Sequence, residues 1–173
     1  CAICKSSISN STTATGNTAV GDSALGSTTT GNNNTAVGTF NGSTLPALYN
    51  NTTGVNNTAV GQGALATTVT HSDNTAVGVN TLRDSNGGEA NVAVGSRAGE
   101  TITTGDRNTM IGAVAGLNAT TCDDLVAIGY GAGGASGTKT GHDNTAVGVV
   151  ALGAFTSGER NTAVGSNAAQ ATT

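Results

Sequence analysis

The pentapeptide Asn-Thr-Ala-Val-Gly recurs along this chain at an almost constant spacing, and this repeat limits the fold more than any other feature. Counting imperfect copies, the closing glycines are Gly21, Gly38, Gly61, Gly78, Gly95, Gly112, Gly129, Gly148 and Gly165. Successive glycines are 17 residues apart, except for a step of 23 after Gly38 and a step of 19 after Gly129. A short fixed period indicates a solenoid, in which each repeat completes its core only by stacking on its neighbours.

Each pentapeptide predicts a strand with two different faces. The residue before the glycine is always β-branched, and the residue two places earlier is Thr or Val. These two positions share one face of a strand, and stiff β-branched side chains favour that backbone. We expect the Val/Ile face to form the core. The other face carries Ala in every copy except at Met110, and it should let another wall of the coil or a neighbouring subunit approach closely.

The chain is therefore predicted to be all-β: a parallel β-solenoid, or β-roll, of about nine coils with mostly 17 residues per coil. The repeat domain is expected over residues 16–173, after an N-terminal arm at residues 1–15. At the usual parallel-strand spacing of about 4.8 Å, nine coils make a rod of roughly 40–45 Å. Both ends of such a rod expose a strand edge. We hypothesise head-to-tail stacking, with the arm lying on a neighbouring subunit.

A second apolar pair, usually Ala-Leu, follows each glycine, but three middle coils lack the leucine. There the pair is Ala98-Gly99, Ala115-Gly116 and Ala132-Gly133. We expect the core to narrow in these coils, or to leave space for a partner.

The first residue of the pentapeptide predicts a column of asparagines along the rod. Leu125 is the exception in this series. The side-chain amides of the asparagines should hydrogen-bond to one another along the rod axis. This is a structural role rather than ligand binding. These residues are Asn17, Asn34, Asn57, Asn74, Asn91, Asn108, Asn144 and Asn161.

Composition argues against several classes of function. Only 9% of residues are charged and the net charge is -4. The six basic residues are scattered, whereas nucleic-acid binding needs a concentrated basic face. No apolar run approaches the about 20 residues of a membrane span. His71 and His142 lie in turns far apart in the sequence, so we expect no enzyme, no metal site and no cofactor.

Cysteines and sequons are candidate modification sites. The chain has an odd number of cysteines: Cys1, Cys4 and Cys122. Two alternatives are open: a disulfide from the arm to Cys122, within one subunit or between two, or free or locally paired thiols. A lipidated Cys1 is a weaker alternative. An Asn/Thr-rich chain produces Asn-x-Ser/Thr sequons by chance. The best candidates for glycosylation lie off the main strands, and they are Asn41, Asn50, Asn51 and Asn118.

The longer of two insertions carries rare aromatic and proline residues. Six extra residues lie between Gly38 and Ala47, and this segment contains Phe40 and Pro46, with Tyr49 close by. Insertions in solenoids emerge as surface loops that often bind partners. The simpler interpretation, which we favour, is a neutral insertion that covers Leu45.

The repeats resemble those of two related groups of fibrous proteins. Residues 57–65, Asn-Thr-Ala-Val-Gly-Gln-Gly-Ala-Leu, resemble viral and phage tail-fibre repeats, of the kind that precede an endosialidase-type intramolecular chaperone. Residues 124–129, Asp-Leu-Val-Ala-Ile-Gly, are similar to the β-roll motif in the heads of trimeric autotransporter adhesins. The resemblance covers residues 17–165 and implies a homo-oligomer outside the cell or on a cell or virion surface. Adhesin heads have a shorter period, so the cross-section need not match.

Two classes of function remain. The first is a structural subunit of an extracellular filament, built by end-to-end stacking of identical solenoids. The second is a trimeric adhesin or tail-fibre segment whose loops bind glycans or proteins on a host surface. The first is slightly favoured by the regular rod and its uncapped ends. In both, the main partner is the chain itself.

Overall fold

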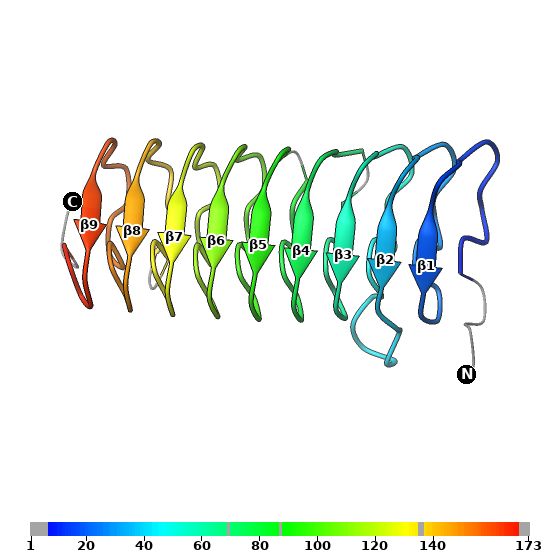
Figure 1. Cartoon of the computed structure of the whole chain (residues 1–173), viewed down its shortest axis with the longest axis horizontal. Coiled ribbons are helices and arrows are strands. Elements are labelled where there is room, and N and C mark those ends of the chain that lie inside the picture. The colour runs from blue at the N-terminus through cyan, green and yellow to red at the C-terminus, as the bar shows by residue number, and fades with distance from the viewer. Residues whose placement is uncertain (1–6, 69, 87, 135–136, 170–173) are drawn as a thin grey trace.

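The computed structural model describes residues 7–68, 70–86, 88–134 and 137–169. It confirms an all-β parallel solenoid: short strands lie side by side in one sheet, in sequence order, along a straight rod with the termini near opposite ends (Figure 1). Every strand has three residues. They are β1 Thr18–Val20, β2 Thr35–Val37, β3 Thr58–Val60, β4 Thr75–Val77, β5 Val92–Val94, β6 Thr109–Ile111, β7 Val126–Ile128, β8 Thr145–Val147 and β9 Thr162–Val164.

Equivalent residues of neighbouring repeats stand directly beside one another. In the pairing of β3 with β4, Thr58 aligns with Thr75 and Val60 with Val77. The closing glycine is required by the close approach of the next coil. A Cβ on Gly112 would lie 2.6 Å from the carbonyl oxygen of Gly129, and the φ of Gly112 is 130°. The strand therefore ends where only glycine fits.

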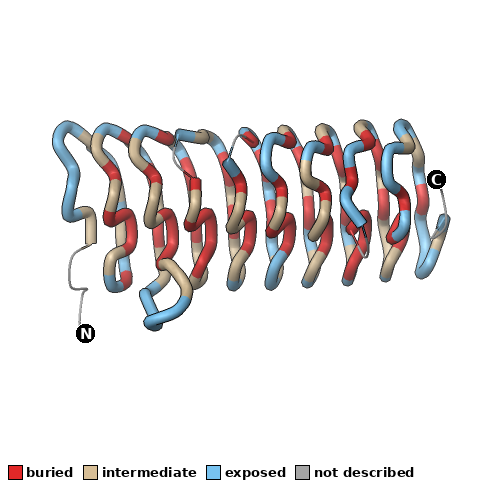
Figure 2. Tube along the Cα trace, turned by 180° about the vertical axis from the view of Figure 1, so that it is seen from behind, coloured by how far each residue is buried: buried red, intermediate tan, exposed pale blue. Residues whose placement is uncertain are grey.

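The two faces of the strands are the reverse of the prediction. The alanines point inward and are fully buried in the middle strands, as at Ala59, Ala76 and Ala93. The Val/Ile residues point outward, and Val94 and Ile111 remain 38% and 41% exposed. The expectation that the Val/Ile face forms the core is wrong. The structure buries the small side chains in the narrow coil and leaves the branched ones outside. Buried and exposed stretches alternate along the coils in Figure 2.

Leucines from the turns provide the bulk of the core. Five of them are fully buried, each four residues after a closing glycine except Leu48, which the insertion places ten residues after Gly38: Leu25, Leu48, Leu65, Leu82 and Leu152. Their φ angles are 54°, 50°, 49°, 48° and 49° in that order, so each adopts the left-handed conformation that is strained for a branched residue. The core thus consists of strand alanines packed against turn leucines.

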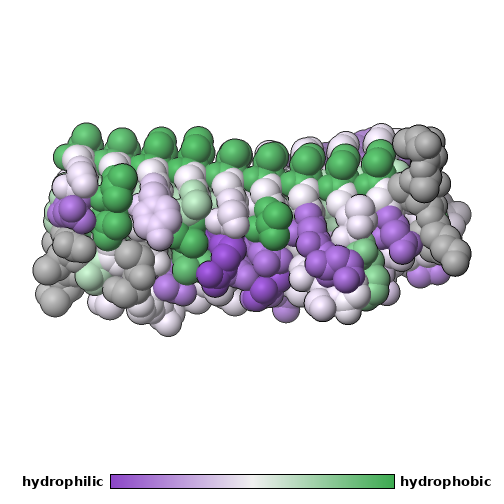
Figure 3. All heavy atoms as spheres, turned by 90° about the horizontal axis from the view of Figure 1, so that it is seen from below, coloured by the Kyte–Doolittle hydropathy of each residue, from purple (hydrophilic) through white to green (hydrophobic). Residues whose placement is uncertain are grey.

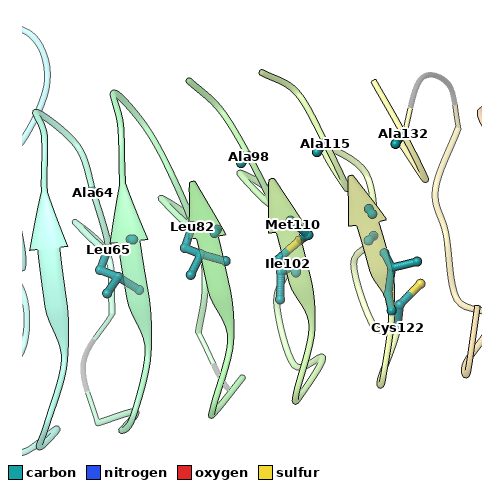
Figure 4. Packing of buried hydrophobic residues seen from close by; sticks show 14 of the residues in the cluster. Ala64, Leu65, Leu82, Ala98, Ile102, Met110, Ala115, Cys122 and Ala132 are labelled. Carbon is teal, nitrogen blue, oxygen red and sulfur yellow. The ribbon is translucent and has the colours of Figure 1, made fainter. Parts of the chain in front are cut away.

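The middle coils keep the same backbone but fill the core differently. Gly99, Gly116 and Gly133 have φ angles of 57°, 58° and 62°, which match the leucines they replace. The vacated volume is occupied by Met110 from β6 (Figure 4) and by Leu125 before β7, both fully buried. The predicted narrowing, or space for a partner, is therefore wrong. Glycine relieves the left-handed strain, and larger residues elsewhere restore the packing.

The described part of the arm continues the solenoid. The amide of Ile8 donates to the carbonyl of Ala24 at 3.2 Å, and that of Thr12 donates to Thr29 at 3.0 Å. Residues 7–15 thus lie on the first coil of their own chain. Contact of the arm with another subunit stays a prediction. Within the described ranges, no helix is long and apolar enough to cross a membrane.

Candidate functional surfaces

A continuous apolar row runs along the outside of the sheet. We call it the valine ridge, and it consists of the residues before the closing glycines: Val20, Val37, Val60, Val77, Val94, Ile111, Ile128, Val147 and Val164. Figure 3 shows this row of hydrophobic residues along the full length of the rod. The ridge residues are intermediate or exposed, and Val164 at the end is 69% exposed.

Further exposed apolar side chains lie next to the ridge. Val79, Tyr130 and Val149 each follow a closing glycine, and their exposed fractions are 48%, 61% and 48%. The strand residues beside them are uncharged in all nine strands. The ridge itself is apolar, uncharged and regular along the axis, whereas its border is mixed: Thr shares the outer face in seven of the nine strands, and Asp22 and Gln62 follow their closing glycines. The sequence already contained this signal, because each strand has an apolar residue on both faces.

The asparagines form the expected column inside the turns. The backbone amide of Asn91 donates to Oδ1 of Asn74, and that of Asn108 donates to Oδ1 of Asn91, both at 2.9 Å. Each side-chain amide except that of Asn161 also donates to a turn carbonyl, as from Nδ2 of Asn91 to Gly105 at 2.8 Å. The six internal asparagines are fully buried: Asn34, Asn57, Asn74, Asn91, Asn108 and Asn144. Asn17 and Asn161 occupy the same position nearer the ends and are partly exposed.

The column is interrupted at Leu125. Its backbone amide donates to Oδ1 of Asn108 at 2.9 Å, but its own side chain has no acceptor for the following coil. The Leu125 side chain instead packs near Gly116 and Gly133. The break in the polar column thus supplies apolar volume to the coils that lack a turn leucine.

Charged residues pair between neighbouring coils. Both Nε and Nη2 of Arg107 donate to the Asp124 carboxylate at 2.8 Å, and this hydrogen bond lowers the pKa of Asp124. Glu100 is only 3% exposed, and its oxygens lie 2.7 Å from Nη1 of Arg83 and 2.5 Å from Nε of Arg97. The described residues contain no group of three or more His, Cys, Asp and Glu side chains placed to hold a metal ion.

Cys122 is a free thiol in the core, not an accessible thiol in a turn. It is fully buried, and burial, with a smaller effect of Asp123, raises its pKa to about 12. Burial lowers the pKa of Lys139, whose Nζ lies 5.4 Å from the centroid of the Phe155 ring. Cys1 and Cys4 lie outside the described residues. A bridge from the arm to Cys122 would require this residue to leave the core, which argues against it.

The candidate glycosylation sites differ in accessibility. Asn41 is exposed, whereas Asn50 and Asn118 are partly buried. Nδ2 of Asn118 donates to the carbonyl of Gly134 at 3.3 Å. Asn51 is fully buried and its Nδ2 donates to Gly54 at 3.1 Å, so the prediction of a glycan there is wrong for the folded chain.

The insertion at residues 39–46 leaves the rod as a loop after β2 (Figure 1). Phe40 is 46% exposed, but Pro46 is buried and does not present a contact surface. Phe40, Leu45 and Tyr49 line a cavity of about 250 Å³ together with Ser23 from the preceding coil. The structure therefore brings together two of the three residues predicted for partner contact.

Comparisons with known proteins add no relative: no protein-family model, curated protein or solved structure matches this chain.

Proposed function

We propose that the chain is a structural subunit of an extracellular fibre, in which identical solenoids associate along the valine ridge. The observation that carries the proposal is the length and regularity of this exposed apolar row. A monomeric soluble protein rarely exposes a contiguous apolar patch beyond a few hundred Å². Nine three-residue strands, at about 4.8 Å spacing and about 3.3 Å per residue, present an outer face of roughly 400 Å², along which the ridge is the apolar row.

A second copy of the chain fits this surface better than an unrelated partner. The ridge repeats once per coil, so two copies have the same pitch and their side chains can interdigitate along the whole rod. The outer face of the sheet is about half of the about 800 Å² that each partner buries in a standard interface, so the flanking turns would also take part in the contact. No charge on the strands opposes the contact. These features favour a lateral homo-oligomer, such as a dimer or trimer.

End-to-end stacking is the second mode of assembly that specific residues favour. Thr162 and Val164 of β9 are exposed, and among the described residues β9 pairs only with β8. A strand edge without such a partner is a template for another strand. At the amino end, residues 7–15 provide the surface that would meet it. Both modes produce a fibre, and they can occur together.

Native mass measurement and electron microscopy separate these modes. We expect the wild-type chain to be a discrete oligomer, and the triple variant Val94→Lys, Ile111→Lys and Ile128→Lys to be a folded monomer by circular dichroism and light scattering. The matched control, Asn86→Lys, Thr104→Lys and Thr121→Lys, places the same charge on exposed turn residues and should stay oligomeric. A monomeric wild-type chain would contradict lateral association.

The axial contact has its own test. Long filaments from the wild-type chain, lost when residues 1–15 are deleted, would support stacking through the arm. Filaments that persist in the truncated chain would overturn that role of the arm.

A further inference from the structure

The cavity beneath the insertion combines features that solenoid coils without an insertion do not have. The amide of Phe40 donates to the carbonyl of Asp22 at 3.4 Å, and the carbonyl of Leu45 accepts from Gly63 at 3.0 Å. The loop is thus tied to the coil before it and to the coil after it. Oδ1 of Asn41 also accepts from the amides of Ser43 and Thr44 at 3.0 and 2.9 Å, which fixes the turn at its tip.

Aromatic side chains are concentrated at this cavity. The chain has only two Phe and two Tyr residues, and Phe40 and Tyr49 both line it. The Tyr49 ring is held against the backbone of Gly26, because a Cβ there would lie 3.2 and 3.3 Å from Cε2 and Cδ2. Phe40 is 46% exposed and would bury apolar area on binding a ligand. Because the insertion loop is hydrogen-bonded to two coils and the Tyr49 ring is packed, the cavity exists before a ligand binds.

Size and polarity limit what the cavity can take. Its volume of about 250 Å³ is below the about 300–1,000 Å³ typical of sites for drug-sized ligands, so it admits a single ring-sized group. Ser23 and Tyr49 are the hydroxyl-bearing residues of the lining, and Oγ of Ser23 donates to Oδ1 of the exposed Asp22 at 3.2 Å. The oxygen of a hydroxyl group that donates one hydrogen bond can still accept another from a polar ligand.

Charge excludes anionic ligands. Among the described residues, no Lys or Arg precedes Arg83, and Oδ1 of Asp22 lies 3.2 Å from Oγ of the lining residue Ser23. The charge that the described residues place at the cavity is therefore negative, which disfavours phosphate, sulfate and acidic sugars. A neutral sugar suits the site, because its C–H face can lie on an aromatic ring while its hydroxyls donate to a carboxylate and exchange bonds with hydroxyls.

We infer that this cavity is a binding site for one neutral pyranose ring, formed by Phe40, Tyr49, Leu45 and Ser23 with Asp22 at its edge. The site lies within one chain and does not rest on how copies assemble. Several copies on one fibre would raise the avidity for a glycan-covered surface.

Saturation-transfer NMR tests this site with the methyl glycosides of glucose, galactose, mannose, fucose and N-acetylglucosamine. We expect transfer to at least one of them and none to N-acetylneuraminic acid. Phe40→Ala should weaken binding at least tenfold. Tyr130→Ala, which removes an exposed ring at another coil, should leave it unchanged.

Three outcomes overturn the inference: no transfer to any methyl glycoside, transfer that Phe40→Ala retains in full, or a clear preference for the anionic sugar. N-acetyl-leucine amide is included as a probe for a protein side chain, and binding of this probe alone would also overturn it. Because Phe40 is half-exposed, its replacement should not unfold the chain, and circular dichroism checks this.

Discussion

Met110 and Gly116 share one volume of the core. A Cβ on Gly116 would lie 2.6 Å from Sδ of Met110 and 2.8 Å from its Cγ. In the coil of β4, the equivalent positions hold Ala76 and Leu82, with the sizes reversed. The strand residue and the turn residue of one coil therefore compensate each other, and neither can change alone without a cavity or a clash.

This relationship predicts strong coupling between the two positions. Met110→Ala should lower the free energy of unfolding by about 2–5 kcal/mol, because it leaves a cavity. Gly116→Leu should also destabilise, because its side chain meets Met110 and its φ is 58°. The double variant restores the Ala/Leu pattern of the β4 coil and should be more stable than either single variant. Urea unfolding measures all four chains, and strictly additive losses would contradict shared volume.

The asparagine column predicts that an Asn→Ala substitution lowers the free energy of unfolding more where the side chain is buried than near the ends of the rod. Asn91→Ala removes the acceptor of the Asn108 amide and the donor to the Gly105 carbonyl. Each buried group left without a partner costs about 1–3 kcal/mol, so the two together should cost about 2–6 kcal/mol. Asn17→Ala, made near the end where the side chain is partly exposed, is the matched control and should cost less. Equal losses at both positions would mean that burial does not govern the effect.

The sequence was sufficient for the period, the parallel fold and the asparagine column, because these follow from identical residues at a fixed spacing. It did not reveal which strand face is inside. Alternation separates two faces, but Ala76 and Val77 are both apolar, so hydrophobicity alone does not orient them. The size of the coil interior decides which strand face is buried. This size depends on how the turn places the Leu82 side chain in the core. The cavity beside Phe40 could not be predicted from the sequence either, because it depends on the path of an irregular loop.

A buried ion pair should contribute more to the free energy of unfolding than an exposed one. Glu100→Gln removes the negative charge between Arg83 and Arg97 at a carboxylate that is 3% exposed, and should cost about 1–3 kcal/mol. Asp124→Asn breaks the exposed pair with Arg107 and should cost less. Arg107 lowers the pKa of Asp124, so its contribution is present near neutral pH and is lost as the pH falls through that lowered pKa. Unfolding at low and high salt should show the larger salt effect for the Asp124 pair.

The buried thiol predicts a loss of stability at alkaline pH. The pKa of Cys122 rises from 9.0 to about 12 on folding, because burial penalises the thiolate. The unfolded chain therefore releases this proton first, and the contribution of the neutral thiol is complete below pH 9 and declines as the pH rises towards 12. By pH 10 the decline should reach about 1 kcal/mol. Cys122→Ala lacks this proton, so the difference in unfolding free energy between wild type and variant should shrink from pH 8 to pH 10. A difference that stays constant over this range would show that the folded chain does not hold the thiol neutral.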